Sequence, residues 1–134
     1  KYFFLIILMI CVFSDVGGYI FGKIFGGKKL TKISPNKTIS GSIGSFILSF
    51  IGFFTIYFYF NDLLFVRLQI ETLFFIPLII SLICQIGDLF ISYYKRRAKV
   101  KNTGDIIPGH GGLLDRIDGI IFALPIGFII ISLF

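Results

Sequence analysis

Two polar stretches enclosed by apolar sequence decide the fold of this chain: GDLFISYYKRR at residues 87–97 and PGHGGLLDRID at residues 108–118. Residues 87–118 hold four of the six aspartates, the only histidine, and six of the thirteen lysines and arginines. Charged residues beside membrane segments are costly and usually mark functional sites. The clustering therefore predicts a site at the edge of a membrane.

The composition indicates an integral membrane protein. Hydrophobic residues make up 56% of the 134 residues, charged residues only 15%, and the mean hydropathy is +0.95. These values lie far from the averages of soluble domains. The chain begins with Lys1 rather than Met and leads straight into an apolar run, so we expect the carboxy-terminal part of a longer multi-span protein. Residues 1–14 show no signal-peptide pattern. Cys11 and Cys84 lie in apolar runs and are expected to be buried thiols.

Four apolar segments predict an all-α polytopic membrane helix bundle: residues 2–13, 42–60, 73–94 and 119–134. The first segment is short for a span, which a missing start would explain. The acidic and glycine-rich residues 14–19 follow it, so that Asp15 either ends a helix in water or contributes to the site. Residues 22–44, 61–72 and 95–118 are predicted to connect the segments.

Cations are concentrated in two of these connections. Residues 14–41 carry five and residues 95–118 carry six, whereas residues 61–72 carry only Arg67. The two groups are Lys23, Lys28, Lys29, Lys32 and Lys37, and Lys95, Arg96, Arg97, Lys99, Lys101 and Arg116. Positively charged loops stay on the cytoplasmic side. We therefore expect a multi-pass protein of the cell inner (cytoplasmic) membrane, with its site facing the cytoplasm.

The turn SPNKT at residues 34–38 is predicted to open a helix. Ser34 or Thr38 can cap the first turn, and a proline just inside a helix start is favourable. Free backbone N–H groups near Lys37 suit an anionic oxygen. Ordinary basic loops of membrane proteins share this texture, so the signal is weak on its own.

Three carboxylates can converge on a metal ion. Asp88, Ser92 and Lys95 share one helix face, and Asp115 and Asp118 share another if a helix has begun there. Carboxylate oxygens, waters and substrate phosphates are the ligands that Mg²⁺ prefers. A structural alternative stays open, in which Asp88 pairs with Lys95 and Asp115 with its neighbouring arginine.

The glycine-rich turn around His110 would let a ligand approach the backbone closely. His110 has no second histidine or cysteine nearby for a zinc site, so a phosphate contact or a proton-transfer role is favoured. Basic residues are not interleaved with aromatic residues on a soluble face, which argues against nucleic-acid binding.

GDL at 87–89, SYYKR at 92–96 and PGHGGLLDRID at 108–118 form a pattern that resembles the signature of the phosphatidate cytidylyltransferases, also called CDP-diglyceride synthases. An earlier block, from Ser14 to Gly41, matches the family as well. It contains Ser14 and Asp15, GK at 22–23, FG at 25–26 and SPNKT at 34–38. Gly18 stands where the family often has alanine. The chain also departs from the family at Asn102, where an acidic residue is usual.

The resemblance implies transfer of CMP from CTP to phosphatidic acid, giving CDP-diacylglycerol and pyrophosphate. It implies Mg²⁺, with a second cation as an option, held by Asp88, Asp115 and Asp118. The implied catalytic residues are these three with Lys95 and His110. The implied substrate-binding residues are Asp15, Ser34, Lys37, Thr38, Arg96, Gly111, Gly112 and Arg116.

Other functions remain open from the sequence. An ion- or proton-coupled transporter would use Asp88 and Asp115 as carriers, and would place them near the middle of the membrane. A sister enzyme could act on another lipid phosphate. An inactive scaffold paralogue would fit the change at Asn102. The expected partners are CTP, phosphatidic acid and the bilayer, with a homodimer as an option.

Overall fold

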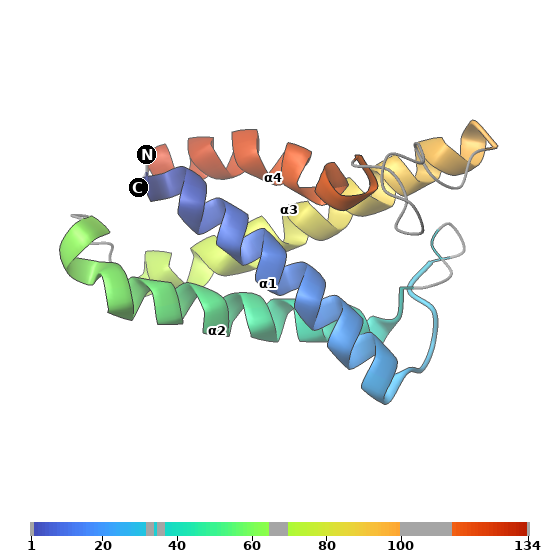
Figure 1. The fold of residues 1–134 in the computed structure, drawn as a ribbon, viewed down its shortest axis with the longest axis horizontal. Coiled ribbons are helices and arrows are strands. Elements are labelled where there is room, and N and C mark those ends of the chain that lie inside the picture. The colour runs from blue at the N-terminus through green and yellow to red at the C-terminus, as the bar shows by residue number, and fades with distance from the viewer. Residues whose placement is uncertain (1, 32–33, 35–36, 65–69, 100–113, 134) are drawn as a thin grey trace.

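The computed structural model describes residues 2–31, 34, 37–64, 70–99 and 114–133. Over these residues the chain is all-helical, as predicted, with α1 (Tyr2–Phe25), α2 (Ile39–Leu64), α3 (Ile70–Arg97) and α4 (Leu114–Leu133). Figure 1 shows α1 crossing α2, and α4 lying along α3. The fold is thus two helix pairs packed into one bundle.

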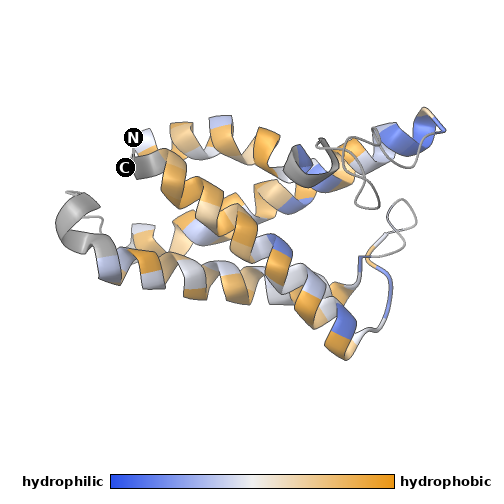
Figure 2. Cartoon of the chain, in the orientation of Figure 1, coloured by the Kyte–Doolittle hydropathy of each residue, from blue (hydrophilic) through white to orange (hydrophobic). Residues whose placement is uncertain are grey.

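Three of the helices are long and apolar enough to cross a membrane: Phe4–Phe25, Ile39–Tyr59 and Thr72–Arg97. The apolar part of α4, Asp118–Ser132, is shorter. A helix satisfies its own backbone hydrogen bonds, which a bilayer core demands of any spanning segment. Figure 2 shows apolar residues covering most of the length of the helices. The predicted membrane bundle is therefore confirmed.

The polar parts of the bundle gather at one end. The end of α1, the connection to α2, the end of α3 and the start of α4 all lie there (Figures 1 and 2). The start of α1 and the end of α4 lie at the opposite end. The described parts of the two cation-rich connections therefore lie at the same end of the bundle.

The predicted helix boundaries are wrong around the glycine-rich segments. α1 continues through residues 14–19 to Phe25, and α2 begins at Ile39, so the connection predicted at residues 22–44 is shorter. In the same way α3 includes Lys95 and α4 begins at Leu114. Glycine does not end a membrane helix where a neighbouring helix packs against it. Asp15 is consequently a mid-helix residue and not a solvated helix end.

Close approach of α1 and α2 depends on glycines. A Cβ atom on Gly17 would overlap the carbonyl oxygen of Gly44, and one on Gly41 would lie 2.7 Å from the carbonyl oxygen of Gly18. These obstacles are backbone atoms, which cannot rotate away. Small residues allow this kind of contact between membrane helices. The crossing brings the first turns of α2 against the middle of α1.

A core of aliphatic side chains and two thiols fills the bundle away from the polar end. Ile10, Ile80, Cys11 and Cys84 are fully buried, and Ala123 of α4 packs with them. Both cysteines are free thiols, as predicted. The core therefore links α1, α3 and α4 beneath the polar residues.

The crossing yields a stability prediction. Gly17→Ala should destabilise the folded protein by about 1–3 kcal/mol, the usual cost of overpacking, because its new methyl group meets the backbone of α2. The matched control is Gly127→Ala, whose Cβ would come nearest to atoms of the Ile7 side chain, at 3.2 Å, and not to backbone. Thermal unfolding in detergent measures both variants. Equal unfolding temperatures for the two variants would contradict the inference that backbone contacts at Gly17 limit how closely α1 and α2 approach.

Candidate functional site

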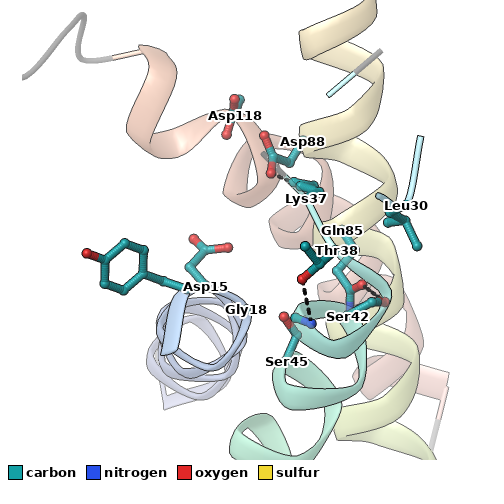
Figure 3. Close-up of a pocket in the computed structure, with 12 residues that line it drawn as sticks. Asp15, Gly18, Leu30, Lys37, Thr38, Ser42, Ser45, Gln85, Asp88 and Asp118 are labelled. Atoms are coloured by element: carbon teal, nitrogen blue, oxygen red, sulfur yellow. Dashed lines mark hydrogen bonds and ion pairs between the residues drawn. The ribbon is translucent and has the colours of Figure 1, made fainter. Parts of the chain in front are cut away.

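A pocket of about 430 Å³ lies where the polar end meets the bundle. All four helices and the α1–α2 connection contribute to it (Figure 3). Its lining residues are Asp15, Gly18, Tyr19, Leu30, Lys37, Thr38, Gly41, Ser42, Ser45, Gln85, Asp88 and Asp118. A concave site with converging polar groups is the usual form of a small-molecule site.

Three carboxylates enter this pocket from three different helices. Asp88 on α3 and Asp118 on α4 lie side by side, close enough for their carboxyl groups to interact directly. Asp15 projects toward them from α1 (Figure 3). Asp118 accepts a hydrogen bond of 2.9 Å from the backbone N–H of Gly119, which fixes one of its oxygens. The pocket is therefore rich in anionic oxygen.

Two lysines balance these acids. Lys37, just before α2, forms an ion pair with Asp88 (Figure 3). Lys95 approaches Asp118, with 3.5 Å between Nζ and Oδ2. The four side chains are only partly exposed. Breaking a pair of this kind is costly because it leaves a charge without its partner.

The lysine of the connection is held in place by local hydrogen bonds. The backbone N–H of Leu30 donates to the carbonyl of Lys37 at 2.7 Å, and the N–H of Ile39 donates to the carbonyl of Lys28 at 3.1 Å. Thr38 caps α2, because its hydroxyl accepts from the N–H of Gly41 at 3.1 Å. The predicted hydroxyl cap is thus present at Thr38.

The structure brings together most of the predicted site residues that it describes. Asp15, Lys37, Thr38, Asp88 and Asp118 line the pocket, and Lys95 reaches it through Asp118.

Two predicted residues lie elsewhere. Ser34 belongs to the preceding turn, where its carbonyl accepts from the N–H of Lys37 at 3.1 Å. Arg96 is exposed at the end of α3 and does not line the pocket.

The remaining predicted site residues lie outside the described part of the structure. They are His110, Gly111 and Gly112, together with the side chains of Asp115 and Arg116. Asn102 lies outside it as well. Their roles stay predictions.

Sequence reasoning missed three polar residues of the pocket wall: Ser42, Ser45 and Gln85. Ser42 donates its hydroxyl proton to the side-chain oxygen of Gln85 at 2.5 Å, which ties α2 to α3. A signal was available, because Thr38, Ser42 and Ser45 are spaced for one helix face. In an apolar helix such a stripe of hydroxyls faces protein or water and not lipid.

Within the described residues, no three acidic, histidine or cysteine side chains are grouped closely enough to share a metal ion. Mg²⁺ is commonly held by one or two carboxylates, with water and substrate phosphates completing its shell. The adjacent carboxylates of Asp88 and Asp118 fit that donor set.

The comparison with protein families decides which proteins this chain resembles. The model of the cytidylyltransferase family matches residues 1–134. The chain belongs to this family. The resemblance seen in the sequence motifs is thereby confirmed.

Curated relatives carry the name phosphatidate cytidylyltransferase. The chain is 45% identical to the protein of Staphylococcus haemolyticus (strain JCSC1435), over 84% of this chain and 42% of the relative. It is 42% identical to the protein of Rickettsia bellii (strain RML369-C), over 97% of this chain and 58% of the relative. It is 44% identical to the protein of Staphylococcus aureus (strain COL), over 93% of this chain and 45% of the relative. The chain spans about half the length of these relatives.

The ion pair between Lys37 and Asp88 yields a prediction about the α1–α2 connection. Asp88→Asn should loosen residues 26–31 and 37–38, because Lys37 loses the charge that holds it against α3. Hydrogen–deuterium exchange should be faster there, first at the amide of Leu30. Asp118→Asn keeps the Lys37–Asp88 pair and is the matched control. Equal exchange in both variants would show that the pair does not hold the connection.

Proposed function

We propose that the full-length protein transfers CMP from CTP to phosphatidic acid, giving CDP-diacylglycerol and pyrophosphate. Family membership supports the reaction class, and the names of the relatives support the substrates. The observation that carries the proposal is the pocket lined by Asp88, Asp118 and Lys37 beside apolar helices, with Lys95 paired to Asp118. One substrate is lipid-bound and the other is aqueous, so the site must lie at such a boundary.

The chemistry is a displacement at phosphorus. A phosphate oxygen of phosphatidic acid bonds to the α-phosphorus of CTP, the bond from that phosphorus to the oxygen bridging to the β-phosphate breaks, and pyrophosphate leaves. Both reactants are anions that repel each other. Catalysis of phosphoryl transfer depends mainly on positioning and on stabilising charge. Lys37 and Lys95 are placed to contribute cations, and Asp15 is placed to orient donors of the substrate.

Mg²⁺ is the cofactor that this proposal includes. Asp88 and Asp118 would hold it, together with Asp115 if its side chain also faces the pocket. When bound, the ion neutralises phosphate charge. Lys37 and Lys95 pair with the same two aspartates, so cations of the chain itself hold these side chains in position at the pocket.

We further propose that the polar end of the bundle faces the cytoplasm. The described parts of the two cation-rich connections share that end, and positively charged connections are retained on the cytoplasmic side. CTP would then reach the pocket from the cytoplasm, and phosphatidic acid would enter from the inner leaflet.

The activity test measures pyrophosphate release by the full-length protein with CTP, phosphatidic acid and Mg²⁺. Asp118→Asn should lower kcat by about 100-fold or more, the size of losses seen when a group that stabilises transition-state charge is removed. Thr55→Val is the control, because its hydroxyl bonds only within α2. Lipid binding without any CTP-dependent release from the wild type would favour the scaffold alternative.

Orientation is tested by labelling single cysteines in intact cells. Lys28→Cys, at an exposed position of the connection, should resist a membrane-impermeant maleimide until the cells are opened. The reagent should label a cysteine at Asn61 without lysis, because this residue follows the apolar part of α2 that ends at Tyr59. The reverse pattern would place the pocket outside.

A further inference from the structure

The hydroxyl groups at the start of α2 donate their protons to partners within the protein. We propose that Thr38 and Ser42 face the pocket as hydrogen-bond acceptors only, and that this wall binds donor groups of the nucleoside part of CTP. Those donors are the amino group of the base or a hydroxyl of the ribose. The inference rests on the proposed function and deepens it.

The proton of Ser42 is used inside the protein. Ser42 Oγ lies 2.5 Å from Oε1 of Gln85, a separation typical of a short O–H···O bond and too short for an N–H donor. The amide nitrogen of Gln85 donates to Ser81 Oγ at 3.4 Å, and Ser81 shares a buried hydrogen bond of 2.9 Å with Ser14. Both ends of the Gln85 amide are therefore assigned. Only the lone pairs of Ser42 remain for the pocket.

The proton of Thr38 is used as well. Ser40 donates its single hydroxyl proton to the carbonyl of Gly26 at 2.5 Å. The 3.0 Å bond between Thr38 Oγ1 and Ser40 Oγ must then take its proton from Thr38. The N–H of Gly41 already donates to Thr38 at 3.1 Å. A hydroxyl has one proton and two lone pairs, so Thr38 has one lone pair left and nothing to donate.

A wall of acceptors selects its ligand. Phosphate oxygens accept hydrogen bonds and gain nothing from Thr38 or Ser42, whereas Lys37 and Lys95 supply the cations that phosphates need. An amino group carries two donors, which suit acceptors placed one helical turn apart. A site built to bond a donor discriminates strongly against analogues that lack it, because its acceptors are then left without partners. The geometry thus points to the nucleoside side of the pocket.

Gln85 is the positioning residue in this arrangement. It holds the Ser42 proton away from the pocket and is itself held by Ser81. Gln85→Leu would release that proton, so that Ser42 could donate to a carbonyl oxygen. Gln85→Glu keeps an oxygen that accepts the Ser42 proton, so the preference of the pocket for hydrogen-bond donors should be retained.

The experiment compares nucleotides in the full-length protein with phosphatidic acid and saturating Mg²⁺. UTP replaces the base amino group with an oxygen, and deoxy-CTP analogues lack the 2′ or the 3′ hydroxyl. Ser42→Ala should raise KM for CTP about tenfold with little change in kcat, the size of one hydrogen bond. The kcat/KM preference for CTP over one analogue should fall by about the same factor. A smaller preference over UTP would identify the base amino group as the donor that Ser42 binds. A smaller preference over a deoxy analogue would identify a ribose hydroxyl.

Two further variants complete the test. Gln85→Leu should lower the same preference as Ser42→Ala, and Gln85→Glu should restore it. Thr55→Val, on the same helix but outside the pocket, should match the wild type. Size-exclusion profiles establish folding, so that either Ser42→Ala or Gln85→Leu can decide the question if the other misfolds.

Two outcomes overturn the inference while leaving the proposed function standing. In the first outcome the wild type is active and the Ser42→Ala variant has the same nucleotide preferences as the wild type. The other is a Ser42→Ala variant that needs more Mg²⁺ for half-maximal rate with unchanged preferences, which would make the hydroxyl a metal contact. A wild type that releases no pyrophosphate from CTP overturns the proposed function, and the inference with it.

Discussion

The need to keep charge paired at the edge of an apolar bundle governs this structure. Asp88 lies in a helix that is otherwise suited to a bilayer, and its ion pair with Lys37 joins the α1–α2 connection to α3. Removing a charge from water is favourable only where partners and hydrogen bonds replace the solvent. The pair therefore determines where the connection lies, and with it one wall of the pocket.

Backbone packing supplies the second constraint. α1 passes through Gly17 and Gly18 without ending, because α2 approaches it closely at Gly41 and Gly44. Without hydrophobic driving force between helices in lipid, close van der Waals contact at small residues is what holds them together. This crossing places Asp15 of α1 opposite the hydroxyl groups of α2. The same glycines thus serve the fold and the shape of the site.

The pocket separates two kinds of chemistry. Carboxylates and lysines gather between α3, α4 and the connection, whereas hydroxyls and an amide lie between α2 and α3. The first group suits phosphates and a divalent cation. Within the second group, Thr38 and Ser42 have their protons committed within the protein and suit neutral donors. A nucleotide has both parts, which fits membership in the cytidylyltransferase family.

The sequence by itself determined the membrane class, the helical fold, the shared side of the basic connections and the family, because hydropathy, charge and local motifs are properties of the linear chain. It predicted Asp15, Lys37, Asp88 and Asp118 as site residues, yet it ended α1 too early. Only the tertiary structure decided that Lys37 pairs with Asp88 and that Ser42 bonds Gln85. These partners lie more than 40 residues apart, and the crossing of the helices, which no local pattern encodes, decides which side chains meet.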